Sequence, residues 1–410
     1  MEIEEKTGTD ETIQPEEKPK KKRRVLRKTL IIIAALVAAA ALTAVICFAY
    51  FFGRSDYKRD EDVSRLTISE IRSAADSADS KEAEAIRNLA DEEDVLTESE
   101  RELLREQQYA VKLPENKDIY NILLVGLDSR KETRSYGNSD TMMLISIDSS
   151  KKVIHMTSFM RDLYAIVPGY GGRKLNSAHA LGAGPLLVQT IEENWKIPVD
   201  NYASVNFEVM VKVVDAIGGV DLDIKEEELK YVNIYIRQLC SYFRLKFEKH
   251  KIMSAGRQHC DGVQALGYMR VRAVGFDYAR TQRQRNVVQA IMKKLKTLNV
   301  AQIMSLADQI LPSVTHNLDQ ARVFTLLSSA PAILTYRVEE SRVPFDGLYY
   351  SYNQNLICDF TATIARLHHE IYEYEIPEGL PEPVFPGGKE KQVRFPRGYH
   401  GILEESRPAV

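Results

Sequence analysis

The chain has 410 residues, which fits one sizeable folded core with appended segments better than a single average domain. Hydrophobic residues make up 44% of it and charged residues 28%, a composition that excludes a largely disordered or fibrous protein. The net charge of −3 and the isoelectric point near 6.3 exclude a chain that is basic throughout.

The N-terminal region contains one segment suited to a lipid bilayer. Residues 29–52, TLIIIAALVAAAALTAVICFAYFF, carry no charge and no proline, and about 20 apolar residues are enough to cross the hydrocarbon core. We predict a transmembrane helix that is kept as an anchor; the alternative is a cleaved signal peptide, whose apolar region is only about 7–15 residues long. Residues 1–28 are predicted to be a disordered cytoplasmic tail, because they end in a Lys/Arg run without acids that favours the inner side of the cytoplasmic membrane.

Beyond the membrane segment, residues 53–115 show helical spacing of apolar residues among many charges, which predicts a helical stalk. A different pattern begins near Tyr120, where short apolar runs are bounded by Asp, Ser or Asn and therefore predict β-strands. The mixture of strands and helices indicates α/β or α+β layers. The predicted strands are 121–128, 141–148, 152–159 and 220–224, and the predicted helices between them are 184–195 and 206–218.

The remainder predicts helices at 286–299, 303–311, 319–334 and 359–374. Residues 377–410 contain many Pro and Gly residues, which predicts an extended tail. The folded extracytoplasmic domain is therefore predicted to span residues 116–376.

Two carboxylates stand at the ends of the first two predicted strands. Asp128 follows the first apolar run, and Asp140 stands immediately before the second, so a turn between antiparallel strands could bring both to one rim. Facing carboxylates repel unless a proton or a cation lies between them, and an all-oxygen site suits Mg²⁺. The alternative is ordinary turn chemistry, in which Asp is common.

Further polar residues follow the third predicted strand. Arg161 and Asp162 stand at its end, where such a pair is more often structural than catalytic. Lys174 and Asn176 lie in a loop before a helix, and helix N-termini favour anions. His179 lies close by, and we interpret it as structural.

The densest charge cluster is YMRVRAVGFDYARTQRQR, residues 268–285, with five arginines and a single carboxylate, Asp277. Alternation of apolar residues with Arg270 and Arg272 predicts an extended segment that places both guanidiniums on one face. Asp277 is predicted to be the N-cap of a helix that carries Arg280 and Arg283 on one side, near its positive end.

Such a cluster indicates a bound anion. Each cation near a helix N-terminus is unfavourable by about 0.3–1 kcal/mol, and Asp277 alone supplies too little negative charge. Arginine binds phosphate oxygens bidentately, whereas the alternative is a set of solvated arginines that point apart. Nucleic acid is not expected, because the cluster lies beyond the predicted membrane span, the isoelectric point of the chain is near 6.3, and no recognition-helix pattern surrounds the arginines. A lipid-linked phosphate or pyrophosphate at the outer membrane face fits better.

In this order, these stretches resemble the LytR-CpsA-Psr family of membrane-anchored glycopolymer transferases. The matching stretches are NILLVGLDSR, SDTMMLISID, SFMRDLY, KLNSAHALGAG, VNFEVMVKVVDAIGGVDLDI, and GVQALGYMRVR with FDYARTQRQR. Two positions depart from the family pattern: Met160 stands where many members have proline, and HCDG at 259–262 replaces a commoner version with Leu.

The resemblance implies an α-β-α sandwich, in which a central mixed sheet and its helices enclose a hydrophobic channel for a polyprenyl chain. Asp128 and Asp140 would hold Mg²⁺ or Mn²⁺ on the pyrophosphate at the channel mouth. Asp277 would orient an arginine or accept a proton. The arginines implied to bind the pyrophosphate are Arg161, Arg270, Arg272 and Arg280, and the further substrate-binding positions are Arg130, Lys174, Asn176, Arg283 and Gln284.

The implied reaction moves a phosphoglycosyl unit of an anionic or capsular glycopolymer from its polyprenyl-pyrophosphate carrier to a peptidoglycan hydroxyl. Charge on the phosphoryl oxygens would be stabilised by the metal and the arginines. Two alternatives remain open: a phosphatase that uses water as the acceptor, and a non-enzymatic lipid-binding regulatory module. The spacing of Cys240 and Cys260 does not decide between a disulfide and two reduced thiols.

Overall fold

A computed structural model describes residues 88, 92–109, 119–127 and 137–374 of the chain. The predicted tail, transmembrane segment and C-terminal tail lie outside the described residues, as do most of the predicted stalk and both Asp128 and Arg130. None of the helices in the described part is long and apolar enough to cross a bilayer. The membrane anchor at 29–52 therefore stays a prediction.

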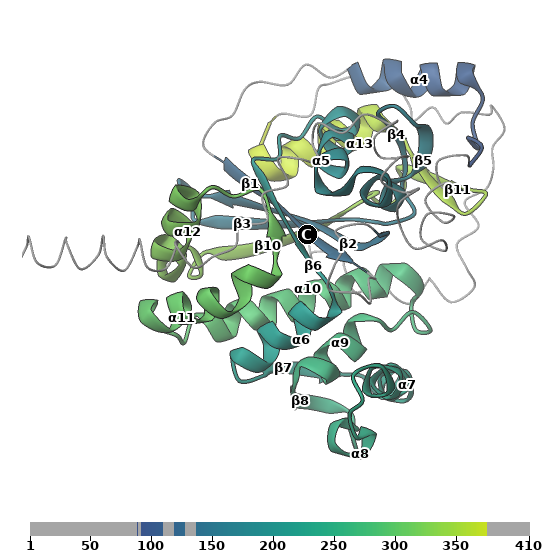
Figure 1. The fold of residues 1–410 in the computed structure, drawn as a ribbon. Helices are drawn as coiled ribbons and strands as arrows, with labels where there is room; N and C mark the ends of the chain where they lie inside the picture. Colours follow the sequence, from purple (N-terminus) through teal and green to yellow (C-terminus); the bar gives the residue numbers. More distant parts are fainter. Residues whose placement is uncertain (1–87, 89–91, 110–118, 128–136, 375–410) are drawn as a thin grey trace, which may run out of the picture. The chain divides into compact units, whose positions relative to one another are not determined.

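A mixed six-stranded sheet forms the middle layer of the folded unit (Figure 1). The strand order is β10-β3-β2-β1-β6-β9; β1, β2 and β3 pair in antiparallel fashion, whereas β6 is parallel to β1 and β10 is parallel to β3. The predicted first three strands are confirmed. The strands are β1 (Ile119–Leu127), β2 (Ser139–Asp148), β3 (Val153–Phe159), β6 (Asn201–Val205), β9 (Thr315–His316) and β10 (Arg337–Val343).

Helices cover both faces of this sheet, as the family resemblance implied (Figure 1). On one face, Leu123 and Val125 of β1 belong to the same core as the buried Trp195. On the other face, Met143 of β2 and Met156 of β3 pack against Met292. The first face carries α5 (Leu175–Trp195) and α13 (Phe360–Tyr372), and the second carries α6 (Phe207–Ala216), α9 (Gly262–Met269) and α10 (Phe276–Leu295).

The other elements surround these layers. Two hairpins are β4 (Tyr164–Val167) with β5 (Gly171–Lys174), and β11 (Tyr349–Tyr352) with β12 (Asn355–Cys358). A third, β7 (Val220–Ile224) with β8 (Gly256–Cys260), accompanies α7 (Glu226–Tyr242) and α8 (Phe247–His250). The remaining helices are α11 (Val300–Ile310), η2 (Leu311–Ser313) and α12 (Gln320–Ile333). The predicted strand at 220–224 and the predicted helices are confirmed, with 286–299 largely forming the second half of α10.

The prediction of an extended segment around Arg270 is wrong. Helix α9 continues to Met269, and Arg270 is its C-cap. Its start is fixed by a capping box, in which the Asp261 carboxylate accepts from the Gln264 N–H and the Gln264 side chain accepts from the Asp261 N–H. The short alternation of apolar residues with Arg270 and Arg272 is compatible with either a strand or the end of a helix. The capping box starts a helix upstream, and this helix runs into the alternating residues.

The prediction that Asp277 caps α10 is also wrong. The N-cap is Gly275, with a left-handed φ of 74°, and Asp277 is the second residue of the helix. Glycine adopts this conformation without steric cost, so the helix is capped two residues before Asp277. The Asp277 carboxylate is therefore available to the arginines around it.

The region beyond α10 contains strands that the sequence analysis missed. Only helices were predicted there, yet β9 to β12 are present, and β10 joins the central sheet as an edge strand. Its sequence, RVEESRV, is mostly half-buried or exposed and rich in charge, which is typical of protected sheet edges. The sequence of β10 contains no apolar run, so the hydrophobic pattern did not predict this strand.

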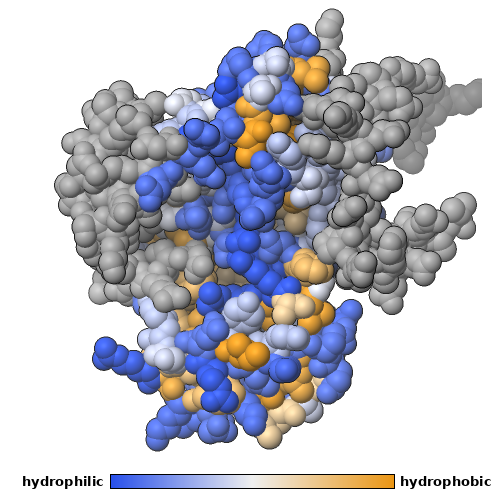
Figure 2. Space-filling model, turned by 90° about the vertical axis from the view of Figure 1, so that its right-hand side faces the viewer, coloured by the Kyte–Doolittle hydropathy of each residue, from blue (hydrophilic) through white to orange (hydrophobic). Residues whose placement is uncertain are grey.

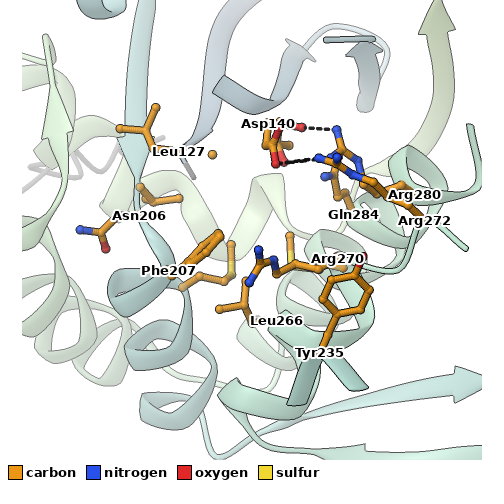
Figure 3. Close-up of a pocket in the computed structure, with 15 residues that line it drawn as sticks. Leu127, Asp140, Asn206, Phe207, Tyr235, Leu266, Arg270, Arg272, Arg280 and Gln284 are labelled. Atoms are coloured by element: carbon orange, nitrogen blue, oxygen red, sulfur yellow. Dashed lines mark hydrogen bonds and ion pairs between the residues drawn. The ribbon is translucent and has the colours of Figure 1, made fainter. Parts of the chain in front are cut away.

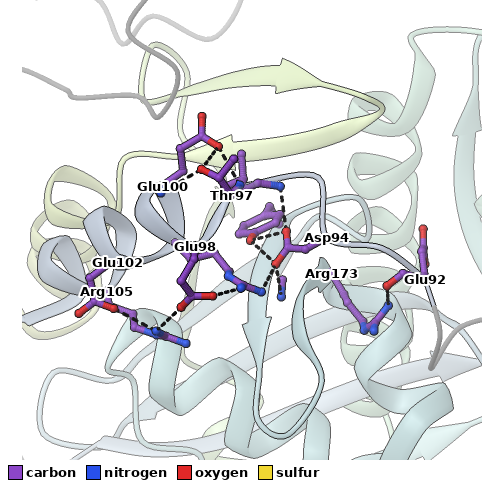
Figure 4. A network of polar contacts seen from close by, with 12 residues as sticks. Glu92, Asp94, Thr97, Glu98, Glu100, Glu102, Arg105 and Arg173 are labelled. Carbon is purple, nitrogen blue, oxygen red and sulfur yellow. Dashed lines mark hydrogen bonds and ion pairs between the residues drawn. The ribbon is translucent and has the colours of Figure 1, made fainter.

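The described end of the predicted stalk is built into the folded domain. Helix α4 (Glu98–Tyr109) buries Leu104 completely in the core that contains α5 and α13. Just before it, Asp94 accepts hydrogen bonds from the Tyr164 hydroxyl at 2.9 Å and the Gly172 N–H at 2.8 Å, and pairs with Arg101 at 2.7 Å (Figure 4). Asp94 thus ties this segment to the β4–β5 hairpin.

Three cysteines, Cys240, Cys260 and Cys358, fall within the described residues, and all three are free and buried. Burial raises the pKa of Cys260 and of Cys358 to about 12, so both are protonated thiols at neutral pH. The structure thus has reduced thiols at Cys240 and Cys260 in place of a disulfide.

We expect Asp94→Ala to lower the free energy of unfolding by about 3 kcal/mol, because it leaves the Tyr164 hydroxyl and the Gly172 N–H without their acceptor. Urea unfolding can be followed through Trp195, the single tryptophan of the chain, which is fully buried. The control is Glu102→Ala, which removes an exposed ion pair with Arg105 and should cost less than about 1 kcal/mol. Equal losses in the two variants would show that Asp94 does not fasten the segment.

Candidate active site

The predicted phosphate-binding residues meet where β2 begins, β3 has just ended and α10 starts. Figure 2, which views the right-hand side of Figure 1, shows hydrophilic residues gathered in a band across a hollowed face of the molecule. The antiparallel register places Met142 of β2 opposite Phe159 of β3, so Asp140 and Arg161 lie at the same rim of the sheet. The sheet edge itself therefore brings together side chains that are distant in sequence.

Asp140 is contacted by three guanidiniums. Its Oδ1 lies 3.2 Å from Arg161 Nη1, and its Oδ2 lies 3.0 Å from Arg272 Nη2 and 3.4 Å from Arg280 Nη1. Arg280 also donates to the backbone carbonyl of Asp140 at 2.9 Å. These arginines come from the β3 end, the loop after α9, and α10, so Asp140 joins three parts of the fold.

Asp277 binds the same three arginines from the other side. Its Oδ2 accepts from Arg161 Nε at 3.0 Å, and its Oδ1 lies 3.5 Å from Arg272 Nε and 3.4 Å from Arg280 Nε. Burial would raise the pKa of the Asp277 carboxyl, but these guanidiniums outweigh it and hold that pKa below its usual range. A carboxylate whose pKa is lowered in this way is a weak base, which favours the orienting role among the two implied for Asp277.

Arg280 is the most enclosed arginine of the cluster, with 2% of its surface exposed. Burial lowers its pKa, although Asp277 and Asp140 act in the opposite direction. Within the described residues, neither Arg280 Nε nor Asp277 Oδ1 makes a hydrogen bond, even though both are buried. These two atoms lie 3.4 Å apart, so they meet as an ion pair and not as a hydrogen bond.

Arg161 has carboxylates on both sides and is not paired with Asp162 alone. Burial opposes its charge, but Asp277, Asp162 and Asp140 together raise the pKa of its guanidinium. Asp162 lies 3.5 Å from Arg161 Nε and 3.2 Å from Lys174 Nζ. Lys174 therefore reaches the edge of the cluster through Asp162.

Asn176 supports the cluster through its backbone. Its N–H donates to the carbonyl of Arg161 at 3.2 Å, and its carbonyl accepts from the Ser139 hydroxyl at 3.4 Å. These bonds tie the start of α5 to the residues beside Asp140. The described contacts of Asn176 thus fix the chain around Arg161 and β2.

A cavity of about 140 Å³ lies beside the arginines (Figure 3). Arg272, Arg280, Gln284 and Asp140 line its polar side, and the residues on its apolar side are Leu127, Phe207, Met210, Leu266 and Met269. The combination of a cationic rim with an apolar wall is suited to a ligand with an anionic head and a hydrocarbon tail.

Arg270 lies in the cavity wall, away from the two carboxylates. Its guanidinium stands 4.5 Å from the ring centre of Phe207 and 5.5 Å from that of Tyr235, between the two rings (Figure 3). Such stacking is a cation–π arrangement, which the sequence analysis did not foresee because Tyr235 belongs to α7, far away in sequence. The predicted common face of Arg270 and Arg272 is therefore absent.

Arg283 does not share a direction with Arg280 as predicted. Its guanidinium forms a buried ion pair with Glu228 of α7 at 2.8 Å and donates to the carbonyls of Val271 and Val274 at 2.9 Å. Since these carbonyls flank Arg272, Arg283 holds the loop that presents Arg272 to the carboxylates. Glu228 was not identified from sequence, where it is one of three consecutive glutamates at a helix start.

Arg285 also points away from the cluster. Its Nε pairs with Glu340 of β10 at 2.8 Å, and its Nη1 donates to the Ser158 hydroxyl at 2.9 Å. Of the five arginines in the stretch 268–285, only Arg272 and Arg280 contact Asp140 and Asp277. Arg161, which follows β3, supplies the third guanidinium that contacts these two carboxylates.

His179 is structural, as interpreted. It is buried, and its Nδ1–H donates to the Gly137 carbonyl at 3.0 Å. Burial lowers its pKa to about 4, so the ring is neutral throughout the physiological range.

Only one of the two predicted metal ligands lies within the described residues. Asp140 lies at the cavity, whereas Asp128 and Arg130 lie outside the described residues. Within residues 92–109, 119–127 and 137–374, no group of three or more His, Cys, Asp or Glu side chains is arranged to hold a metal ion. Mg²⁺ commonly binds through one or two carboxylates plus substrate phosphates, so the carboxylate of Asp140 fits that mode of binding.

The sequence model of the LytR_cpsA_psr family matches residues 80–366, which is more than half of the chain. The chain therefore belongs to the LytR_cpsA_psr family, and the resemblance drawn from its motifs is confirmed.

Individual relatives agree with this membership. Over 245 residues, the chain is 31% identical to the polyisoprenyl-teichoic acid–peptidoglycan teichoic acid transferase TagT of Bacillus subtilis, covering 57% of this chain and 72% of that protein. It is 32% identical over 251 residues to the corresponding transferase TagU of Oceanobacillus iheyensis, covering 58% and 72%. The solved structure "TagT bound to LIIa-WTA" has a TM-score of 0.50 and 26% identity, covering 65% of this chain and 95% of that one.

We expect Glu228→Gln to destabilise the fold by about 3–5 kcal/mol, because it leaves the buried Arg283 guanidinium without its counter-charge. Urea unfolding measures this loss. The matched control is Asp221→Asn, which breaks an exposed pair with Arg257 and should leave stability within the error of the measurement. A similar small effect at both positions would contradict the role assigned to Arg283.

We expect His179 to make the fold less stable in mild acid. The unfolded chain takes up the proton near pH 6.5 and the folded chain only near pH 4, so stability falls as the pH falls between these values. Between pH 7 and pH 5, protonation of His179 in the unfolded chain should lower the free energy of unfolding by about 2 kcal/mol. In His179→Gln, whose amide can still donate to Gly137, this part of the pH dependence should disappear; unchanged pH profiles would contradict the assignment.

Proposed function

We propose that this protein transfers a phosphoglycosyl unit of a glycopolymer from a polyprenyl-pyrophosphate carrier to a hydroxyl of peptidoglycan. The observation that carries the proposal is the convergence of Arg161, Arg272 and Arg280 on Asp140 and Asp277, beside a cavity with an apolar wall. The names of the relatives, which are teichoic acid transferases, support the same class of reaction.

The arginines would bind the pyrophosphate. With the adjoining Asp162 and Lys174 included, four cationic side chains face three carboxylates, so the cluster keeps a net positive charge that an anion can neutralise. Arg272 is more than a third exposed and can turn toward a ligand, whereas Arg280 is nearly enclosed and would donate from a fixed position. Preorganised donors of this kind stabilise charge on phosphoryl oxygens without reorganising during the reaction.

In the reaction one bond forms and one bond breaks. The acceptor oxygen bonds to the phosphorus that carries the glycan, and the bridging P–O bond breaks, so that polyprenyl phosphate leaves with the bridging oxygen. The hydroxyl proton ends on the departing phosphate or on solvent, because the lowered pKa of the Asp277 carboxyl makes its carboxylate a weak base. The product is a phosphodiester between glycopolymer and peptidoglycan.

Asp140, together with Asp128, would hold Mg²⁺ or Mn²⁺ at this site. Such a cation, when bound, would neutralise part of the charge on the pyrophosphate. Arg272, the most exposed of the three guanidiniums that contact Asp140, would then be free to turn toward the phosphate oxygens.

The prenyl chain would lie against Phe207, Met210, Leu266 and Met269. The cavity of about 140 Å³ is smaller than the roughly 300–1,000 Å³ of typical ligand pockets. A long prenyl chain therefore requires α6 and α9 to move away from the sheet as the lipid enters. The anchor predicted at residues 29–52 would keep the domain at the outer face of the cytoplasmic membrane, close to both substrates.

We expect Arg272→Gln to reduce transfer by about 10²–10³-fold, because it removes a partly exposed donor to the phosphoryl oxygens. The measurement is the rate at which a labelled glycan moves from a polyprenyl-pyrophosphate carrier onto isolated peptidoglycan. The control is Arg337→Gln, which changes an exposed arginine on β10 far from the cluster and should leave the rate unchanged.

The same assay separates the alternatives. Release of lipid phosphate with label only in solution would support the phosphatase, in which water is the acceptor. Tight binding of the carrier without any turnover would support the lipid-binding regulatory module. Either result would replace the proposed transfer.

A further inference from the structure

A second cavity lies on the side of α10 that faces away from the arginine cluster. Its volume is about 1000 Å³, and it shares no lining residue with the cavity beside the arginines. The β7–β8 hairpin, which packs against α10, forms one wall, and the second half of α10 forms another (Figure 1). Successive residues of a helix are turned by about 100°, so Arg280 and Lys293 point to roughly opposite sides of α10.

Positive charge is in excess in this cavity, which we call the lysine groove. The cations in its wall are Lys293, Lys294, Lys296 and Arg257, and the carboxylates are Asp221 and Asp223. Asp221 is already occupied, because its Oδ2 accepts from Arg257 at 2.8 Å and its Oδ1 lies 2.8 Å from His259 Nδ1. None of the three lysines forms an ion pair with a described residue, so they carry the excess charge.

The helix dipole accounts for only part of this arrangement. Lys293 and Lys294 lie in the last turn of α10, where a cation is favourable by about 0.3–1 kcal/mol. That interaction requires neither an adjoining cavity nor a third lysine. Like charges this close repel one another, so an anion bound between the lysines would stabilise them.

The wall of the lysine groove also contains a buried hydroxyl group with an unused proton. Arg285 donates to the Gln282 side-chain oxygen, so the Gln282 amide nitrogen donates to Asn286 Oδ1 at 3.1 Å. Asn286 Nδ2 in turn donates to the Tyr268 hydroxyl oxygen at 3.1 Å. These bonds make Tyr268 an acceptor, and its own proton has no acceptor among the described residues. Tyr268 is 3% exposed and lines the groove, so this proton is available to an oxygen of a bound ligand.

These groups suit a ligand with several negative charges and further oxygen atoms. Lysine is a mobile point charge without a bidentate fork, so it suits phosphates that recur along a chain in varying orientations. Nucleic acid fits poorly, because no exposed Phe, Tyr or Trp lines the groove for a base to stack on. A membrane surface also fits poorly, because none of the large hydrophobic residues exposed in the described structure lines the groove.

We propose that the lysine groove is a second binding site, which takes an anionic chain of phosphates joined by polyol or sugar units. The assignment rests on the function proposed above, since such a chain would be the glycopolymer that the pyrophosphate carries. Asn286 at the groove and Arg280 at the cluster are about 9 Å apart along the axis of α10. A polymer of several units therefore reaches both sites, and the second contact raises the affinity for long chains over short ones.

Isothermal titration calorimetry on the full-length protein in detergent tests the groove, with lipid-free poly(glycerol phosphate) as the probe. Replacing all three groove lysines with glutamine should weaken binding by about 10- to 100-fold at low salt and reduce its salt dependence. The matched control replaces three exposed lysines outside the groove and should change the affinity by less than about 2-fold. The groove variant is Lys293→Gln with Lys294→Gln and Lys296→Gln, and the control is Lys246→Gln with Lys249→Gln and Lys251→Gln.

A second variant, Tyr268→Phe, distinguishes a built site from diffuse attraction between charges. Phenylalanine fills the same space but cannot donate a hydrogen bond, so we expect binding of the polymer to weaken by about 3- to 10-fold. Salt screens the lysines but not this neutral donor, so the loss should be similar at low and high salt.

Three outcomes would overturn the assignment. The wild-type protein could fail to bind the polymer, the two triple variants could weaken binding equally, or Tyr268→Phe could bind with wild-type affinity. None of these outcomes touches the proposed transfer, which the labelled-glycan assay decides separately. Loss of transfer with polymer binding intact would instead refute the proposed function and leave the groove as a binding site for anionic polymer.

Discussion

The sharing of Asp140 and Asp277 among three guanidiniums is the interaction on which the rest of the site depends. Arg161, Arg272 and Arg280 come from three different elements, and positive charges this close together repel unless carboxylates lie between them. Much of the pairing is buried, and Arg280 Nε meets Asp277 Oδ1 as an ion pair at 3.4 Å without a hydrogen bond among the described residues. A site of this kind is rigid enough to be preorganised and still has capacity for an anion.

Two groups of contacts outside the cluster keep it in place. The buried pair of Arg283 and Glu228 holds the loop that carries Arg272, so α7 influences the site without lining the arginine cluster. On the opposite face of the sheet, Asp94 fastens the segment before α4 to the β4–β5 hairpin, whose last residue, Lys174, pairs with Asp162 beside Arg161. Stability and substrate binding are thus linked through chain segments that contact no substrate in our proposal.

The cavity beside the cluster explains why one arginine of the family motif differs from its neighbours. Arg270 stacks between Phe207 and Tyr235, where its guanidinium covers apolar surface, while Arg272, two residues later, reaches the carboxylates. The break between them is the end of α9. A short loop therefore directs one cation toward hydrocarbon and the other toward phosphate, which matches a ligand that has both.

The sequence by itself determined the elements that depend on local patterns. The apolar runs of β1, β2 and β3 and the helical spacing of α5, α6 and α13 depend on near neighbours, and the family motifs identified Asp140, Arg161, Arg272, Asp277 and Arg280 as one site. Tertiary structure decided what depends on distant partners: Glu228 and Glu340 take Arg283 and Arg285 out of the cluster, and the polar strand β10 exists because β3 pairs with it. The left-handed Gly275 likewise frees Asp277 from capping, because the energy of a turn and of a buried ion pair depends on what surrounds it and not on residue spacing.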